Sequence, residues 1–286
     1  MIYVSTGGFR NKNAFDSTQF LKSANINSIE LSGGLYCENQ LESLKSIKST
    51  TRFMVHNYFP PTKEPFVFNL ASLNQDVATK SFNHAVMAMQ WAVELDNPNY
   101  SFHAGFLLDP DVKELGKKVK NRELFNREVA LDFFVEQLNK LSTIANKLGV
   151  SLMIENNVLS PGNYNEFSDN PFLMATSDEC KYIMERTPKN INLLIDVAHL
   201  KVSANTLGFN KKEFLEDCSP WIKGYHLSDN NGMRDSNECV NKDSWFWPFL
   251  KKDLNFYTLE VYVDDLSVLV QQLQLAKLKI FSDTNL

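Results

Sequence analysis

The chain has 286 residues, of which 43% are hydrophobic and 22% charged, and its formal net charge is −5 at pH 7. Such a chain buries a substantial core, and its acidic balance argues against a nucleic-acid or anionic-membrane partner. No apolar run approaches the roughly 18 residues that span a bilayer, and the opening MIYVSTGGFR does not read as a signal peptide. The four cysteines are scattered without a C-x-x-C pair. Free thiols are typical of a reducing compartment, so we expect a cytoplasmic protein.

Short β-rich runs alternate with helical patterns along the chain. The predicted strands are residues 2–6, 28–33, 52–58, 100–105, 151–156, 192–197, 222–227 and 256–262. The predicted helices are residues 13–24, 38–49, 77–93, 127–148, 178–187, 210–217, 245–252 and 266–276. Gly149 is placed to end the fourth helix, and Asp264 or Asp265 is available to begin the last one.

Strands that alternate with helices favour parallel pairing, because a parallel crossover needs a dozen or more residues. Eight such units in a chain of this length are the count and size of a (β/α)8 barrel. We therefore predict an α/β fold, a TIM barrel in a single domain over residues 1–286. An open doubly wound sheet is the alternative. Its usual Gly-rich turn is missing, since the segment after the first strand, S-T-G-G-F-R, is not G-x-G-x-x-G.

Carboxylates and imidazoles gather at the carboxyl ends of the predicted strands, where barrel enzymes build their active sites. They are Glu30, His56, His103, Glu155, Asp196, His199, His226, Asp229 and Glu260. Four of the five histidines belong to this set, which random scatter would rarely produce. The fifth, His84, lies in a helical pattern and is expected to be a packing or surface residue.

Four members of this set are the candidate ligands of a divalent metal ion. Glu155, Asp196, His226 and Glu260 would supply three carboxylates and one imidazole, which suits Mn²⁺, Co²⁺, Mg²⁺ or Zn²⁺. Taken singly, each residue has an ordinary explanation, such as a helix cap for Glu30. Taken together, charged groups at barrel strand ends need a partner, and a metal ion supplies it.

Two long segments follow the fourth and fifth predicted strands. Residues 107–128 contain several basic residues, Lys113, Lys117, Lys118, Lys120 and Arg122 among them, between acidic residues, which favours a solvated helix face over a lid or a phosphate contact. Residues 156–179 are long for a connection in a barrel, and such loops at the active face are often covers. Aromatic residues near the strand ends, Tyr262 among them, are expected to serve in core and rim packing.

The motifs at the strand ends resemble those of the xylose-isomerase-like TIM-barrel superfamily. The segments that carry the resemblance are LMIENN, LLIDVAHL, GYHLSDNNGMRD and YTLEVY. This superfamily contains sugar isomerases and epimerases and is related to endonuclease IV. The resemblance implies that the residues Glu155, Asp196, His226 and Glu260 bind one divalent metal ion.

For the epimerase-like branch, the resemblance implies that Glu155 and Glu260 are also the catalytic acid/base pair. The reaction expected is isomerisation or epimerisation of a small sugar, polyol or related derivative by proton transfer through a metal-stabilised enediolate. The residues expected to bind the substrate are His199, Arg234, His103, Asp229 and Asp235. Self-association into a homo-oligomer is left open.

The endonuclease IV branch implies an alternative, a zinc phosphodiesterase that acts on DNA. His56 and His103 match its histidines and are candidate ligands for a second metal ion. That branch also has Asp-x-His after the seventh strand, where this chain has Asp235-Ser236-Asn237. Because asparagine is a poor zinc ligand, one or two metal ions are expected rather than three. A dehydratase or lyase on the same scaffold and a non-catalytic sugar-binding barrel are further alternatives.

Overall fold

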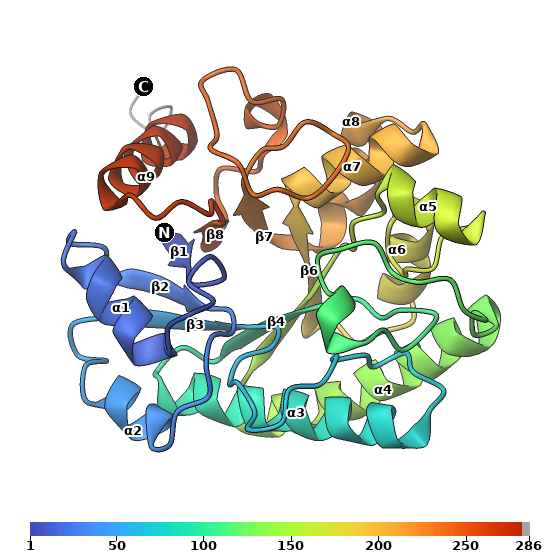
Figure 1. The fold of residues 1–286 in the computed structure, drawn as a ribbon, viewed down its shortest axis with the longest axis horizontal. Coiled ribbons are helices and arrows are strands. Elements are labelled where there is room, and N and C mark those ends of the chain that lie inside the picture. Colours follow the sequence, from blue (N-terminus) through green and yellow to red (C-terminus); the bar gives the residue numbers. More distant parts are fainter. Residues whose placement is uncertain (282–286) are drawn as a thin grey trace.

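A computed structural model describes residues 1–281 and has eight parallel strands that form a closed barrel in chain order (Figure 1). The strands are β1 (Ile2–Ser5), β2 (Ser28–Leu31), β3 (Arg52–His56), β4 (Asn99–His103), β5 (Ser151–Glu155), β6 (Ile191–Asp196), β7 (Ile222–Leu227) and β8 (Phe256–Leu259). The barrel closes where Ile2 of β1 pairs with Tyr257 of β8. The predicted TIM barrel is confirmed, although residues 282–286 of the predicted domain lie outside the described residues.

Side chains inside the barrel form two layers. One lies at its centre and the other at the carboxyl end of the strands. Because side chains alternate along a strand, residues two positions apart point to the same face. A small apolar cluster fills the lumen, and its members are Tyr3, Met54, Met153 and Leu194. The residues two positions further along three of these strands are His56, Glu155 and Asp196. The alternation thus carries the polar side chains to the carboxyl end of the barrel, directly above an apolar floor.

Helices surround the barrel on its outer side (Figure 1). They are α1 (Ala14–Lys22), α2 (Gln40–Lys45), α3 (Gln75–Glu94), α4 (Arg127–Leu148), α5 (Pro161–Phe167), α6 (Ser177–Met184), α7 (Val197–Leu207), α8 (Lys211–Cys218) and α9 (Leu266–Phe281). As predicted, Gly149 ends α4 in the left-handed conformation, with φ of 69°. Asp265 accepts a hydrogen bond from the backbone N–H of Ser267 at the start of α9. No helix among residues 1–281 is long and apolar enough to cross a membrane.

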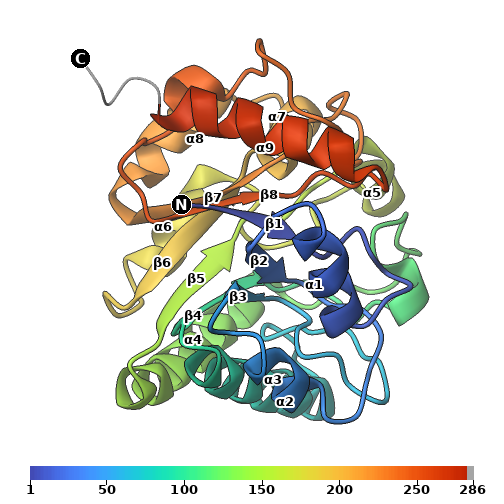
Figure 2. The same ribbon diagram turned by 90° about the vertical axis from the view of Figure 1, so that its left-hand side faces the viewer.

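The solvated helix face expected within residues 107–128 and the predicted helix over residues 245–252 are wrong. Residues 107–126 form a loop with one short 3-10 turn, η1 (Val112–Glu114), and not a solvated helix. Glu114 is buried there and accepts hydrogen bonds from Arg122 and from the backbone of Lys120, which fixes the loop without helical bonds. Residues 245–252 contain only the 3-10 turn η3 (Trp247–Phe249), since Pro248 lacks the N–H that a longer helix needs. Figure 2 shows the first loop and α5 at the end to which the strands point.

Candidate metal centre and active site

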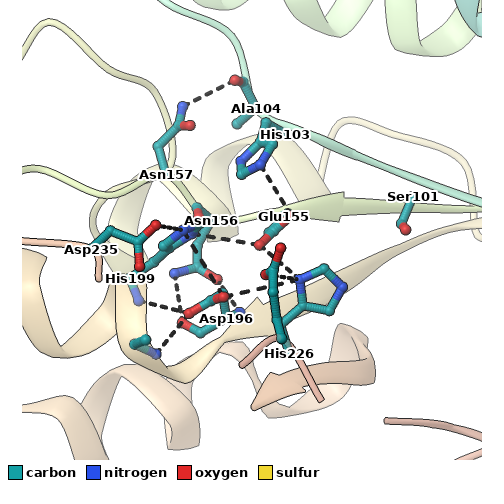
Figure 3. A network of polar contacts seen from close by, with 12 residues as sticks. Ser101, His103, Ala104, Glu155, Asn156, Asn157, Asp196, His199, His226 and Asp235 are labelled. Atoms are coloured by element: carbon teal, nitrogen blue, oxygen red, sulfur yellow. Dashed lines mark hydrogen bonds and ion pairs between the residues drawn. The ribbon is translucent and has the colours of Figure 1, made fainter. Parts of the chain in front are cut away.

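The four predicted metal ligands lie together inside the carboxyl end of the barrel. Glu155 ends β5, Asp196 ends β6, His226 lies in β7 and Glu260 directly follows β8. Each offers one ligand atom, and these atoms all lie within 4.8 Å of one another. The Nδ1 atom of His226 is 3.0 Å from Glu260 Oε2, 3.2 Å from Glu155 Oε1 and 4.0 Å from Asp196 Oδ2. Strands far apart in the sequence thus direct three carboxylates and one imidazole to one point. Figure 3 shows three of these side chains, Glu155, Asp196 and His226, close together.

Several polar atoms of this cluster are buried and make no hydrogen bond within the described residues. They are both carboxylate oxygens of Glu155, Asp196 Oδ2 and His226 Nδ1. A buried polar atom without a partner costs roughly 1–3 kcal/mol, and more if it is charged. Proteins rarely leave four such atoms around one point, so the set fits a divalent cation. The chemistry of the donors, oxygen with one imidazole nitrogen, fits the same group of ions.

Asp196 divides its two oxygens between the fold and the cluster. Its Oδ1 accepts hydrogen bonds of 2.7 Å from the backbone N–H groups of Ala198 and His199, so it caps α7. Its Oδ2 is left facing the cluster. Asn156 fixes the backbone of Asp196 on both sides, because its side chain accepts from the N–H and donates to the carbonyl. The sequence predicted neither the helix cap nor these two hydrogen bonds of Asn156, although Asn156 directly follows the candidate ligand Glu155.

The charges of the cluster strongly influence one another. Burial raises the pKa of Asp196 to about 7. Burial also opposes the ionisation of Glu260, yet the adjacent His226 ring holds the pKa of that carboxyl at about 2. For His226, the carboxylates of Glu30, Glu155 and Glu260 outweigh burial and raise its pKa well above the usual value. A positive charge is therefore strongly favoured at this point, whether a proton or a metal ion carries it.

A second group of candidate ligands shares Glu155 with the first. The Nε2 atoms of His56 and His103 lie 3.3 and 3.5 Å from Glu155 Oε2, and the three residues could hold one ion. His56 Nδ1 lies 2.9 Å from the hydroxyl of Ser101, which directs its Nε2 atom toward Glu155. The rings of His56 and His103 meet edge to face, with centroids 5.6 Å apart. Glu155 therefore lies between two sets of donors.

His199 and Asp235 form a third contact at the margin of the cluster. His199 Nδ1 lies 2.9 Å from the carbonyl oxygen of Asn156, so this nitrogen carries the hydrogen. Its Nε2 lies 3.3 Å from Asp235 Oδ2. The side chains of Asp235 and His103 are 27% and 26% exposed, whereas those of the four predicted ligands are at most 8% exposed. Asp235 and His103 are therefore more accessible to solvent than the four predicted ligands.

Two of the predicted substrate-binding residues lie apart from these contacts. Asp229 has both oxygens occupied, because Lys201 and the backbone N–H of Asn230 bond to Oδ1 and Ser244 bonds to Oδ2. These bonds tie α7 to the loop after β7 and argue against a substrate contact for Asp229. Arg234 is exposed in the same loop, and its contact with a substrate stays a prediction.

Glu30, one of the strand-end residues, is part of the site and does not have the helix-capping role that such a residue often has when it stands alone. Its side chain is fully buried, and its Oε2 lies 2.9 Å from both His226 Nε2 and the Thr258 hydroxyl. In the neutral imidazole this contact holds the hydrogen on Nε2, so that the lone pair of Nδ1 would be available to a metal ion in the cluster. His84 lies outside the cluster, as expected. It bonds to the carbonyl of Asn57 and is buried.

Comparisons with known proteins agree with this architecture. Residues 19–267 match the family described as xylose isomerase-like TIM barrel. The crystal structure of a D-tagatose 3-epimerase-like protein is similar with a TM-score of 0.73 and 18% sequence identity, over 97% of this chain and 96% of that one. A protein from Thermus thermophilus, whose structure followed soaking with zinc chloride, has a TM-score of 0.62 and 18% identity, over 96% and 97% of the two chains.

Two further similar proteins are described differently. An AP endonuclease of family 2 from Brucella melitensis has a TM-score of 0.64 and 10% identity, over 96% of this chain and 98% of that one. An uncharacterised protein of Methanocaldococcus jannaschii is 25% identical over 186 residues, which are 65% of this chain and 61% of that protein. The match thus spans less than two thirds of that relative, and the structural similarities at these identities show the fold alone. Because the family match extends over most of the sequence, the chain belongs to the xylose isomerase-like TIM barrel family.

Proposed function

We propose that the protein is a divalent-metal-dependent isomerase or epimerase of a small sugar, polyol or related derivative. The observation that carries the proposal is the convergence of Glu155, Asp196, His226 and Glu260, with buried donor atoms that have no hydrogen-bond partner. These four residues would hold the ion, which can be Mn²⁺, Co²⁺, Mg²⁺ or Zn²⁺. When bound, such an ion polarises substrate oxygens as a Lewis acid and so makes an adjacent C–H group more acidic.

Glu155 and Glu260 are the proposed acid and base. They come from β5 and from the end of β8, three strands apart around the barrel, so they reach the centre from different sides. One carboxylate would take a proton from carbon and the other would return one, which is what two-base epimerisation requires. The low pKa of Glu260 keeps that carboxylate ionised at neutral pH, as a metal ligand must be.

Side chains at the exposed margin are proposed to orient the substrate. His199 has its Nδ1 fixed by the Asn156 carbonyl, so its Nε2 is directed toward Asp235 and the open side of the cluster. Together with His103 and Asp235, it is placed to bond substrate hydroxyl groups. Replacing water at these positions by sugar hydroxyls would hold the reacting carbon near the acid/base pair.

Substitution of Glu155 by Gln tests the proposal. The change keeps the shape of the side chain but removes a base and a metal-binding charge, so the rate should fall by roughly 10²–10⁴-fold or more. The measurement is turnover of a panel of ketoses and aldoses by protein loaded with Mn²⁺, Co²⁺, Mg²⁺ or Zn²⁺. Glu136→Gln on the exposed face of α4 is the matched control and should leave the rate unchanged. Equal rates for Glu155→Gln and wild type would refute the assigned role.

A zinc phosphodiesterase acting on DNA is the second candidate, and the His56, His103 and Glu155 group favours it. That group would hold a second ion beside the first and share the Glu155 carboxylate. Asn237 in place of a third histidine and the net charge of −5 weigh against this candidate. Cleavage of DNA with an abasic site, with no turnover of any sugar, would favour the nuclease. Loss of water from a hydroxy-keto substrate would favour a dehydratase on the same site.

A further inference from the structure

We propose that Tyr262 is a positioning residue for Glu260 and that the glycine pair after β1 is there to accommodate it. The hydroxyl of Tyr262 donates a hydrogen bond of 2.7 Å to Glu260 Oε1. The inference rests on the proposed function, because it assigns Glu260 to the metal ion. It adds a residue that the sequence had placed only in rim packing.

The backbone after β8 places the two side chains on one face. The N–H of Glu260 donates to the carbonyl of Leu227, and the N–H of Tyr262 donates to the carbonyl of Asn237. Both bonds are made to β7 and the loop that follows it, so the chain stays extended alongside them. Alternate residues of an extended chain point the same way, which brings the phenol of Tyr262 beside the Glu260 carboxylate.

Gly7 and Gly8 form the surface on which the Tyr262 ring lies. A Cβ atom at Gly7 would lie 2.3 Å from Tyr262 Oη and 3.0 Å from its Cζ, and one at Gly8 would lie 3.1 Å from Cδ1. Neither glycine has a positive φ. Glycine is therefore required at these two positions because the Tyr262 ring lies so close to the backbone, and not because of the backbone conformation. The segment S-T-G-G-F-R does not match a phosphate-binding loop. Its two glycines instead support the ring of Tyr262.

The contact gives the two oxygens of Glu260 different tasks. Oε1 accepts the hydrogen bond from Tyr262, while Oε2 faces His226 Nδ1 at 3.0 Å and the other ligand atoms. A carboxylate without such a partner can rotate, or bind an ion through both oxygens. Tyr262 therefore directs one oxygen of Glu260 to the cation and limits its rotation. Losing an outer contact of this kind typically costs 10–100-fold in metal affinity or activity.

The Tyr262→Phe variant tests this inference through metal binding, without need of a substrate. It keeps the ring on the glycine pair and removes only the hydroxyl. Apo protein is titrated with Co²⁺, and the visible absorption bands report coordination geometry while their rise gives the affinity. We expect altered bands and a roughly 10–100-fold weaker affinity in Tyr262→Phe. The matched control is Tyr257→Phe, which removes the hydroxyl of a tyrosine in β8 that is bonded to the Lys251 carbonyl, and this variant should bind Co²⁺ like wild type.

A double-mutant cycle separates positioning from packing. Gly7→Ala pushes against the Tyr262 hydroxyl and should weaken Co²⁺ binding as Tyr262→Phe does. Because the closest clash is with that oxygen, the double variant should bind Co²⁺ no more weakly than Tyr262→Phe alone. Fully additive losses, or wild-type bands and affinity in Tyr262→Phe, would overturn the inference and leave the proposed function intact. Absence of Co²⁺ binding by the wild type would overturn the proposed function, and the inference with it.

Discussion

Glu155 lies within ion-pair distance of ring nitrogens of four histidines. His226 Nδ1 and His199 Nδ1 lie 3.2 and 3.5 Å from its Oε1, while His56 Nε2 and His103 Nε2 lie 3.3 and 3.5 Å from its Oε2. Burial opposes its ionisation, but the surrounding imidazoles hold the pKa of Glu155 well below its usual range. A change at this position therefore affects, at once, the two candidate metal groups that contain Glu155.

His84 provides a prediction that is independent of the metal centre. Burial lowers the pKa of His84 from 6.5 to about 4, and the ring lies against Phe66 and Phe68. Below pH 6.5 the unfolded chain gains a proton at His84 that the folded protein does not take up until about pH 4. Between pH 7 and pH 4 this residue should therefore cost about 3 kcal/mol of folding free energy.

His84→Gln separates this effect from the other titrating groups. Glutamine still donates to the Asn57 carbonyl but does not titrate, so the variant should lose about 3 kcal/mol less than wild type as the pH falls from 7 to 4. Urea unfolding at several pH values measures the difference. Parallel pH profiles for the two proteins would show that His84 is not held neutral.

At the scale of single elements, Gly149 tests the end of α4. Its φ of 69° is costly for a residue with a Cβ atom, so Gly149→Ala should reduce the free energy of unfolding by about 1 kcal/mol. Metal binding should be unchanged, because this end of α4 lies just before the amino end of β5. The control is Gly162→Ala inside α5, which has no positive φ and meets only Ser160 Oγ at 3.8 Å. A loss of stability in the control equal to that in Gly149→Ala would contradict the explanation.

Most strands and the longer helices could be predicted because their signals are local. Alternating runs, apolar periodicity and the cap at Gly149 need only a few neighbouring residues. Helix α7 could not be predicted in this way, because it begins directly after β6 and its apolar residues continue the apolar run of the strand. Asp196, which caps it, had been interpreted only as a ligand. The loop around Glu114 was also missed, since its stability depends on Arg122 and on burial.

The contacts within the site depend on closure of the barrel, so fewer of them could be predicted from the sequence. Spacing and strand position indicated the four candidate metal ligands, since parallel strands end at one face. The partner of His226, Glu30, is 196 residues away in sequence and meets it only when the barrel closes. The contact of Tyr262 with Gly7 likewise joins the segment after the last strand to the segment after the first. Such pairs have no local signal, so they became visible only with the structure.

At the scale of the whole molecule, barrel closure is what creates the candidate metal centre. Pairing of β8 with β1 and of β7 with β8 completes the ring and brings Glu260 and His226 to the carboxylates of β5 and β6. The apolar floor in the lumen closes the barrel beneath them. At the carboxyl end of the strands, Asp235 and His103 are more exposed than the four candidate ligands.

The most direct test of the account is an anomalous difference map from crystals grown with Co²⁺. We expect a peak at roughly 2.0–2.3 Å from donor atoms of Glu155, Asp196, His226 and Glu260. A second peak beside His56 and His103 would be compatible with the shared Glu155. No peak among the four residues, or cobalt bound only elsewhere, would contradict the account.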